Sequence, residues 1–418
     1  MIRVEKARRI ILNSIKPLQC EYARTKDGLD RIVASDVKAK VMLPPFDNSA
    51  MDGYALKAVD TKLVSGARPR IFKVVEDLPA GYSPKRRVNG GEATRIMTGA
   101  PLPAGADSVV MVEYTKKQGS SRGRVKDSVE VYARVKRGEN VRRRGEDVKR
   151  GQEVLSKGSV LRPQEIGMLA ALGMKSVKVA RKPRVGILAT GDELVGLAAK
   201  LTKGKIRNSN SFIISAQTAK CGGLAIDLGI ARDTRDKVRK KIASGLKKRL
   251  DMLLVIGGIS VGDYDLVKDV LLELGMRMKF WKVAQRPGKP LAFGVIKGIP
   301  VFGLPGNPVS STISFEEYVR PSLLKMQGAK DLFRPGLWAL MMEDFHKKEG
   351  LRYFVRAKIS QKDGRFYCIP TGPQGSGIIK SLILADGIIV APEEIKTIKK
   401  GQRVYVQLLR HGYDGGAI

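Results

Sequence analysis

The stretch that decides the fold is residues 184–194, which read RVGILATGDEL. Residues 185–189 form a continuous apolar run, as expected for a strand that is covered on both faces. A threonine, a glycine and two acidic residues follow this run directly. The stretch therefore predicts a buried strand of a parallel sheet that ends in a loop able to carry chemistry.

Apolar strands and helical patterns alternate around this stretch, from about residue 182 to residue 328. This alternation predicts a doubly wound α/β domain with a mainly parallel sheet. The further elements expected in it are a helix near 210–220, a strand at 224–231, a helix at 234–249, a strand at 252–256, a helix at 265–274, a strand at 300–304 and a helix from about 308.

The regions outside this α/β domain have a different pattern. Residues 53–140 are rich in short strands that glycine and proline turns separate, which predicts a β-rich domain. Residues 1–52 and 141–181 predict a mixed linking domain, and residues 329–418 a small C-terminal β domain. The predicted fold class is therefore multidomain α/β plus β, with the α/β domain at residues 182–328.

The charge of the chain is strongly unbalanced, because 77 Lys and Arg residues against 41 Asp and Glu residues give a formal net charge of +36. Such a field attracts polyanions such as nucleic acid, anionic lipid or phosphorylated ligands. The excess is spread along the chain, since residues 116–150 carry a net +8 and residues 232–250 a net +7. We expect nonspecific attraction to polyanions as a background property.

Other features of the sequence indicate where in the cell the protein is located. Charged residues interrupt the apolar positions of the N-terminus, which fall at helical spacing and do not match a signal peptide. No apolar run approaches the ~18 residues that span a bilayer, so we expect no membrane partner. The three cysteines form no C-x-x-C pair and suit a reducing compartment. We therefore expect a cytoplasmic protein.

Three loops are expected at the carboxyl ends of the parallel strands, where open α/β sheets bind ligands. They are residues 190–194, TGDEL; residues 257–265, GGISVGDYD; and residues 303–311, GLPGNPVSS. Their glycines allow a ligand to approach the backbone closely. None matches the P-loop or the G-x-G-x-x-G motif, which removes the main support for a P-loop or dinucleotide site.

Carboxylates accompany these loops. Glu193, Asp233 and Asp265 could hold Mg²⁺ through oxygen ligands. The alternative is that Asp265 and Asn307 merely cap helices. Three such loops at one sheet edge favour a ligand site.

Residues 281–290, WKVAQRPGKP, add positive charge. Lys282, Arg286 and Lys289 could reach one side of a short connection and hold a phosphate or oxyanion together with Mg²⁺. The alternative is that these side chains are simply solvated. The prolines on both sides of Lys289 restrict the backbone and favour a fixed lysine.

Three further segments lie outside the α/β domain. Residues 44–55, PPFDNSAMDGYA, and residues 95–103, RIMTGAPLP, are dense in turn formers and could be interdomain connections. Residues 142–147, RRRGED, could be a solvated cluster of ion pairs or an anion site.

Together these segments resemble the molybdopterin molybdotransferase family, of the MoeA and gephyrin E-domain type. The matching stretches occur in the order of the family and run from about residue 44 to residue 377. They are PPFDNSAMDGYAL, RIMTGAPLPAGAD, RRRGED, TGDEL, GGISVGDYD, RPGKPLAFG, GLPGNPVS and TGPQGSG.

The resemblance implies an activity and an assembly. The activity is insertion of molybdate, or of tungstate, into adenylylated molybdopterin with Mg²⁺-dependent release of AMP, which gives molybdenum cofactor. The assembly is an elongated homodimer of four-domain subunits, with residues 1–52 and 141–181 as its linking and dimerisation domain. Each site would lie between the molybdopterin-binding α/β domain of one subunit and the β-rich domain of the other, and other pathway enzymes would supply the molybdopterin.

The resemblance also implies roles for individual residues, by their position in the motifs. The implied catalytic residues are Asp52, Thr98, Glu193, Asp233 and Asp265, of which the last three would hold the metal. The implied substrate contacts are Arg142, Asp147, Lys282, Arg286, Lys289, Pro305, Pro308, Ser310, Arg356 and Ser376. Many relatives have lysine where Arg286 stands, and the two cations bind anions differently.

Two alternatives stay open at this point. The α/β domain alone also resembles molybdopterin adenylyltransferases, but these lack the β-rich region with its two motifs. The net charge of +36 motivates a polyanion-binding or scaffold protein. Aromatic residues make up only 6% of the chain and are not interleaved with basic segments, which is untypical of base stacking.

Overall fold

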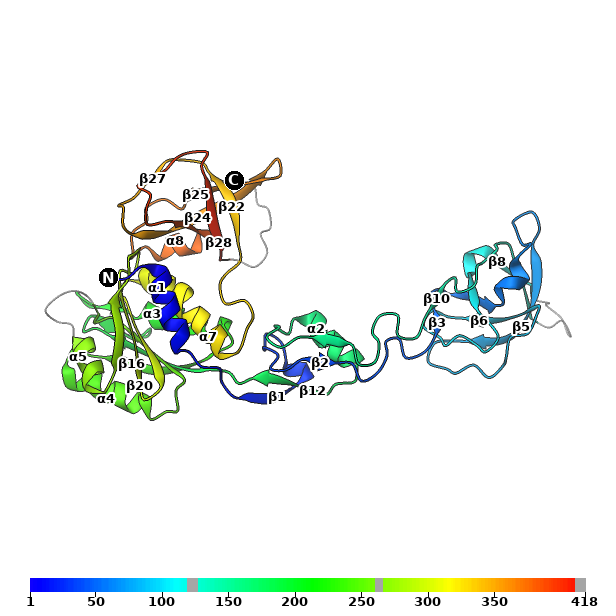
Figure 1. The fold of residues 1–418 in the computed structure, drawn as a ribbon, viewed down its shortest axis with the longest axis horizontal. Coiled ribbons are helices and arrows are strands. Elements are labelled where there is room, and N and C mark those ends of the chain that lie inside the picture. Colours follow the sequence, from blue (N-terminus) through cyan, green and yellow to red (C-terminus); the bar gives the residue numbers. More distant parts are fainter. Residues whose placement is uncertain (119–126, 260–265, 410–418) are drawn as a thin grey trace.

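The molecule is elongated (Figure 1). This computed structural model describes residues 1–118, 127–259 and 266–409. An α/β unit and a C-terminal β unit lie together at one end, and a β-rich unit lies at the other end. The chain crosses the linking segment between the two ends twice, once on the way out and once on the way back.

The α/β unit is built on a sheet with the strand order β16-β13-β17-β21-β20-β18. The first four strands of this order run parallel; β20 pairs antiparallel with β21, and β18 pairs antiparallel with β20, so only β20 runs in the opposite direction. The predicted doubly wound, mainly parallel sheet is therefore confirmed. Its strands are β13 (Arg184–Thr190), β16 (Leu224–Ala231), β17 (Met252–Ile256), β18 (Arg277–Lys282), β20 (Pro290–Ile296) and β21 (Ile299–Leu304).

Helices cover both faces of this sheet, as the continuous apolar strands require. Buried side chains of α1, α3, α6 and α7 pack into one core cluster, and those of α4 and α5 pack into a second cluster across the sheet. A π-helical turn joins α6 to α7. These elements are α1 (Val4–Ser14), α3 (Ser209–Lys220), α4 (Arg235–Leu246), α5 (Leu266–Glu273), α6 (Pro308–Ser314), the π-helical turn η4 (Phe315–Val319) and α7 (Arg320–Met326).

The N-terminal helix α1 packs on the α/β unit, although the linking segment follows it directly in the sequence. Val4, Ala7 and Ile11 are at most 1% exposed and lie on one face of the helix, at the spacing that the sequence predicts. Burying that apolar face against η4 and α7 holds the start of the chain beside the end of the α/β unit.

The linking segment is made from paired outgoing and returning stretches of chain. β1 pairs with β12, β2 with β11, and β3 with β10, all antiparallel. These pairings make the link a continuous structure. Its elements are β1 (Cys20–Arg24), η1 (Thr25–Asp27), β2 (Val37–Lys38), β3 (Asn48–Ser49), β10 (Val141–Arg142), β11 (Glu153–Leu155), α2 (Pro163–Ala171) and β12 (Ser176–Ala180).

The β-rich unit has the strand order β7-β4-β6-β5-β9-β8, and its core is formed by residues such as Phe72 and Val110. The predicted β-rich architecture is confirmed. Its elements are β4 (Gly53–Leu56), η2 (Ala58–Thr61), β5 (Arg70–Leu78), β6 (Glu92–Ile96), β7 (Ser108–Met111), η3 (Val112–Tyr114), β8 (Thr115–Gln118) and β9 (Ser128–Val131).

The C-terminal unit is a closed barrel, because β24 pairs with β26 at the end of the order β24-β25-β22-β28-β26. The short strand β19 of the α/β unit adds to β24 from outside. The elements are β19 (Gln285–Arg286), β22 (Gly336–Met341), β23 (Phe345–His346), β24 (Arg352–Lys362), β25 (Arg365–Pro370), α8 (Ile379–Ile383), β26 (Gly387–Ala391), β27 (Thr397–Ile398) and β28 (Arg403–Leu408); β14 (Leu194–Val195) and β15 (Ile206–Arg207) complete the α/β unit.

Among the described residues, no helix is both long enough and apolar enough to cross a membrane.

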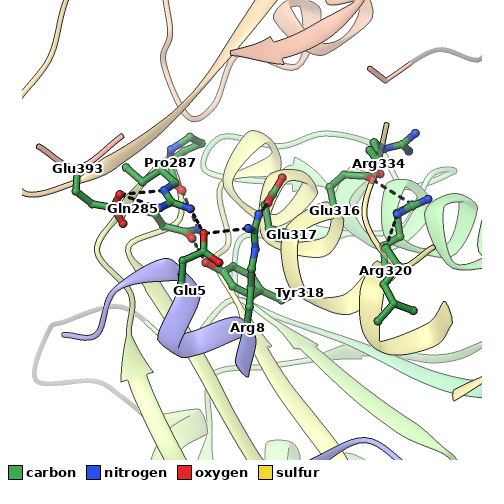
Figure 2. Close-up of polar contacts among 12 residues, drawn as sticks. Glu5, Arg8, Gln285, Pro287, Glu316, Glu317, Tyr318, Arg320, Arg334 and Glu393 are labelled. Carbon is green, nitrogen blue, oxygen red and sulfur yellow. Dashed lines mark hydrogen bonds and ion pairs between the residues drawn. The ribbon is translucent and has the colours of Figure 1, made fainter. Parts of the chain in front are cut away.

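A buried carboxylate joins three parts of the chain near η4 (Figure 2). The Glu317 side chain is 3% exposed and forms an ion pair with Arg8 of α1. Arg8 also donates to Glu5 at 3.2 Å, and Glu5 in turn pairs with Arg352 of the C-terminal barrel. Burial raises the pKa of Glu317, and the charge of Arg8 opposes that rise. Arg8 therefore supplies the positive charge that partly offsets the cost of burying this carboxyl group.

Replacing Arg8 by methionine should leave Glu317 without its cation. We expect the free energy of unfolding of the α/β unit to fall by about 3–5 kcal/mol, because a buried charge without its partner is strongly destabilising. Scanning calorimetry measures the change. The matched control is Arg24→Met, whose ion pair with Asp27 is 71% and 49% exposed and should contribute about 1 kcal/mol or less. Equal destabilisation by both substitutions would contradict the account.

Candidate active site

A cavity of about 700 Å³ lies at the carboxyl ends of the parallel strands. Its lining includes Thr190 and Gly191 at the end of β13, Gly257 after β17, and Pro305 after β21. Because four neighbouring parallel strands end at this edge, the loops that follow them converge there. This is the convergence that the three glycine-rich loops predict.

Glycine is required where the second loop begins. Gly257 and Gly258 have φ values of +92° and +62°. A Cβ atom on Gly257 would lie 2.6 Å from the Thr190 carbonyl oxygen, and one on Gly258 would lie 2.4 Å from a methyl carbon of Val267. A side chain at either position would displace the loop, so these glycines set the shape of the cavity floor.

Glu193 and Asp233 both line the cavity and are exposed to it. The Asp233 carboxylate accepts a hydrogen bond from the Asp192 amide at 3.2 Å, and the Asp192 carboxylate accepts one from the Asp233 amide at 3.3 Å. These reciprocal bonds fix the loop after β13 against the loop after β16. Asp265 and the rest of residues 260–265 lie outside the described residues.

A hard cation suits this donor set in part. Within the described residues, no group of three or more His, Cys, Asp and Glu side chains is placed to hold a metal ion. Two carboxylates nevertheless share the cavity, and Mg²⁺ in phosphate-transfer sites is usually held by one or two carboxylates and by oxygens of the substrate. Glu193 and Asp233 therefore fit Mg²⁺ bound together with a phosphorylated ligand.

Polar residues at the start of α3 complete this cavity, and they are not among the residues predicted from the sequence. The Asn208 side chain caps α3 by accepting from the Ser211 amide at 3.2 Å. The side-chain Nδ2 of Asn210 donates to the Gly306 carbonyl at 2.6 Å and so fixes the loop after β21. The signal that could have found them is the polar run 208–211, NSNS, at the start of a helix that follows the acidic loop.

Pro305, Pro308 and Ser310 line the same cavity, as the motif GLPGNPVS suggests. Lys282 and Lys289 are not among the described residues that line it. Lys282 is half-buried at the end of β18, and Lys289 is exposed next to Pro290, which does line the cavity. Lys282 lies opposite Pro290 in the sheet, so both lysines flank a residue that lines the cavity.

A second cavity, of about 600 Å³, lies where the α/β unit meets the C-terminal barrel. Arg286 and Arg356 both line it. Arg356 is 1% exposed, and its guanidinium donates to the Ser381 hydroxyl at 3.1 Å and to the Gly375 carbonyl at 3.0 Å. Burial lowers the pKa of Arg356 to about 10, so the side chain stays charged at neutral pH. The Ser381 and Gly375 oxygens are neutral and do not balance the positive charge of Arg356. A bound anion could balance it.

Ser376 lies in the loop between the two cavities. Gly375 lines the second cavity and Gly377 the first, and the Ser376 carbonyl accepts from the Val309 amide of α6 at 3.0 Å. Gln374 fixes this loop on β24, because its side chain accepts from the Arg356 amide at 2.9 Å and donates to the Arg356 carbonyl at 3.1 Å. Gln374 belongs to the motif TGPQGSG but was not predicted as a site residue.

Asp52 and Thr98 meet in the β-rich unit, which lies at the far end of the molecule from the α/β unit and the barrel (Figure 1). The Asp52 carboxylate accepts from the Thr98 amide at 2.7 Å and from the Thr98 hydroxyl at 2.7 Å. The hydrogen bond from the Thr98 amide has the largest effect and that from the Thr98 hydroxyl the next largest. Both hold the pKa of Asp52 below its ordinary value. Asp52 is therefore an exposed, ionised carboxylate in a fixed orientation, and one chain does not bring it to the cavities.

Arg142 and Asp147 are exposed, and they lie where the linking segment joins the β-rich unit. The carboxylate that organises the RRRGED segment is Asp47, which pairs with Arg143 at 2.7 Å and accepts from the Arg144 amide at 2.8 Å. Asp47 belongs to PPFDNSAMDGYA, so the two motifs are neighbours in space. Strand β10, which includes Arg142 and shortly precedes Asp147, lies at the β-rich end of the molecule, away from the α/β unit and the barrel (Figure 1).

Comparisons with known proteins agree with this architecture. Residues 2–173 match the family model of the MoeA N-terminal region (domain I and II), residues 186–325 match a probable molybdopterin binding domain, and residues 339–409 match the MoeA C-terminal region (domain IV). A molybdopterin molybdenumtransferase of Bacillus subtilis is 34% identical over 98% of this chain and 94% of its own length. The chain belongs to the MoeA family.

Further relatives support the membership. Molybdopterin molybdenumtransferase 2 of Mycobacterium tuberculosis is 35% identical and covers 90% of the chain and 91% of its own length. The crystal structure of a molybdopterin biosynthesis MoeA protein from Pyrococcus horikoshii OT3 aligns with a TM-score of 0.82 at 30% identity, over 98% of this chain and 100% of that one. The similarity thus extends over all four units.

Thr98→Ala should raise the pKa of Asp52 toward its ordinary value, because the hydrogen bond from the hydroxyl is lost. The hydrogen bond from the backbone amide remains and should keep part of the lowering. Thr98→Ser is the control and should leave the pKa low. Since folding lowers this pKa, the Asp52–Thr98 contact is complete above the ordinary pKa of aspartate and is lost as the pH falls through the lowered value. A carboxyl-carbon NMR titration of Asp52 measures it. The same pKa in the Ala and Ser variants would contradict the assignment.

Proposed function

We propose that this chain inserts molybdate, or the similarly shaped tungstate, into adenylylated molybdopterin and so produces molybdenum cofactor with release of AMP. The observation that carries the proposal is the pair of adjoining cavities. One presents carboxylates at the end of a parallel sheet, and the other presents a buried guanidinium without a carboxylate partner among the described residues. The names of relatives along the whole chain support it.

The second cavity suits the oxyanion. Molybdate is a tetrahedral dianion, and guanidinium groups and hydroxyls are the donors that hold such anions. Arg356 approaches from the barrel and Arg286 from the α/β unit. An anion between them would neutralise the desolvated Arg356, which protein oxygens leave uncompensated. Ser376, between the two cavities, would pass the oxyanion toward the pterin.

The first cavity suits the pterin substrate and its pyrophosphate link. Glu193 and Asp233, with Asp265, would hold Mg²⁺ together with oxygens of this link. When bound, Mg²⁺ supplies charge neutralisation at the phosphate oxygens. Ser310 can donate its hydroxyl to the substrate from the start of α6, and Pro305 and Pro308 shape the wall beside it. The flanking Lys282 and Lys289 provide positive charge for the phosphate that departs with AMP.

We further propose that the active enzyme is a homodimer. Asp52, Thr98, Arg142 and Asp147 lie at the opposite end of the subunit from both cavities, so they can serve a site only if a partner subunit places them there. Exposed apolar side chains on the α/β unit, among them Leu197, Ile206 and Phe212 at 54–58% exposure, fit a surface that another copy covers.

We place the enzyme in the cytoplasm, because its three cysteines are free thiols.

This function is favoured over the two alternatives. Relatives named as molybdenumtransferases align with the chain over its whole length, including the β-rich unit that distinguishes this family from the adenylyltransferases. The net charge of +36 is then a field around an anion-binding enzyme.

The purified protein, incubated with adenylylated molybdopterin, molybdate and Mg²⁺, should release AMP and form molybdenum-loaded pterin in equal amounts. Both products are quantified by chromatography with metal analysis. Absence of AMP and of loaded pterin in the presence of all three components would overturn the proposed function.

Arg356→Met should raise the concentration of molybdate that gives half-maximal rate about 10- to 100-fold, because a charge-assisted hydrogen bond of about 1.5–3 kcal/mol is lost. The fold should survive, since no carboxylate among the described residues is left without a cation. The control is Arg365→Met in the exposed β24–β25 hairpin. An unchanged molybdate dependence in Arg356→Met would remove Arg356 from the site.

A further inference from the structure

Gln285 occupies an unusual place for a polar side chain, because it is 0% exposed and lies directly before the loop that carries Arg286 and Lys289. Its amide nitrogen donates to the Pro287 carbonyl at 3.1 Å and to the Gly288 carbonyl at 3.2 Å. Its amide oxygen accepts from the hydroxyl of Tyr318. All three hydrogen bonds act on, or support, the backbone of this one loop. Figure 2 shows Gln285 with Pro287 and Tyr318.

Tyr318 fixes the orientation of the Gln285 amide. It lies in the π-helical turn η4 and is 1% exposed. Its hydroxyl can donate to the Gln285 oxygen only if the Gln285 nitrogen faces the opposite way, toward the loop carbonyls. Burial raises the pKa of Tyr318 well above its ordinary value, so this hydroxyl keeps its proton across the physiological range. The series of hydrogen bonds that runs from Tyr318 through Gln285 to the loop carbonyls therefore has a single donor-to-acceptor direction.

The loop has little room to take another path. Gly288 has a φ of +86°, and a Cβ atom there would lie 2.7 Å from the Ser314 hydroxyl and 2.8 Å from the Gln285 nitrogen. The loop backbone is thus packed against α6 on one side and against Gln285 on the other. Val283 also closes the loop, because its amide donates to the Lys289 carbonyl at 3.0 Å.

The C-terminal barrel holds the same loop from its outer side. Arg286 pairs with Tyr353 of β24 in a parallel bridge, and the Arg352 amide donates to the Ala284 carbonyl at 2.9 Å. The Arg286 guanidinium lies 5.6 Å from the centre of the Tyr353 ring. The barrel therefore directs the Arg286 side chain, while Gln285 and Tyr318 fix the backbone from which it and Lys289 project.

We propose that Gln285, supported by Tyr318, is a positioning residue that holds the loop at residues 286–289 so that Arg286 and Lys289 face the oxyanion and phosphate together. This inference rests on the proposed function, because it needs those two cations to contact the anionic substrates. Gln285 does not itself reach the substrate. It acts through the two carbonyls that it holds.

The test is the molybdate dependence of the transfer reaction in the full-length protein. Gln285→Leu removes all three hydrogen bonds at similar volume, and Gln285→Glu keeps the acceptor for Tyr318 but loses the donor to the loop. Both should raise the molybdate concentration at half-maximal rate by about tenfold, because a displaced binding group loses its alignment. The rate at saturating molybdate should change less than about twofold. Tyr318→Phe should shift the dependence in the same direction by a smaller factor.

A double-variant experiment separates positioning from a general structural defect. In a background that already carries Arg286→Ala and Lys289→Ala, Gln285→Leu should add less than about a twofold change, since the groups that it positions are gone. A full tenfold additional change in that background would overturn the inference. The control background is Arg365→Met, in which Gln285→Leu should keep its full effect. Should Gln285→Leu not fold, as judged by its thermal unfolding, Tyr318→Phe in the two backgrounds gives the same test.

The failure of this inference can be told apart from the failure of the proposed function. If Arg286→Ala with Lys289→Ala raises the half-maximal molybdate concentration but the Gln285 and Tyr318 variants leave it unchanged, positioning by Gln285 is wrong and the assignment of the cations stands. If removal of both cations leaves the molybdate dependence unchanged, the assignment of the cations is wrong, and the inference falls with it.

Discussion

The ion pair between Glu317 and Arg8 is the interaction on which the arrangement around both cavities depends. A carboxylate buried to this degree costs several kcal/mol unless a cation compensates it, so the N-terminal helix cannot leave the α/β unit without a large penalty. Arg8 and Glu5 then extend the contact to Arg352 of the barrel. The neighbouring Tyr318 turns toward Gln285 and the cationic loop. One turn of π-helix therefore ties together the start of the chain, the sheet edge and the barrel. Such turns are common at functional sites.

A second constraint comes from the elongated link. Antiparallel pairing of outgoing and returning chain makes a continuous connection that keeps the β-rich unit away from the cavities (Figure 1). The candidate groups of the family are consequently divided. Carboxylates and most cations lie around the α/β unit, whereas the oriented Asp52 carboxylate lies at the other end. In the homodimer proposed above, a second copy would supply the groups that one subunit of this shape keeps apart.

Much of the fold could be predicted from local patterns. The apolar run at 185–189 fixed a strand buried on both faces, and helical spacing of Val4, Ala7 and Ile11 fixed the first helix. Periodicity cannot tell where a helix packs, and so it did not reveal that α1 joins the α/β unit. Loops at the carboxyl ends of parallel strands must converge, which is why Glu193, Asp233 and Ser310 could be grouped in advance.

The supporting residues could not be predicted in the same way. Gln285, Gln374 and Asp47 act through contacts with backbone groups or with side chains far away in sequence, and a neutral polar residue carries no periodic or charge signal of its own. The separation of Arg286 and Arg356 from the carboxylates, in a cavity of their own, also depends on how the barrel docks on the α/β unit. That docking is set by tertiary contacts that no local pattern specifies.

In the proposed homodimer, each active site would combine the cavities of one subunit with Asp52 of the partner subunit. Subunits carrying Asp52→Ala and subunits carrying Asp233→Asn, co-expressed with different tags and purified as the mixed dimer, test it most directly. Each variant alone should be inactive. The mixed dimer should regain about half of the wild-type rate of molybdenum insertion, because one of its two sites has both residues intact. A mixed dimer as inactive as its parents would contradict the shared site.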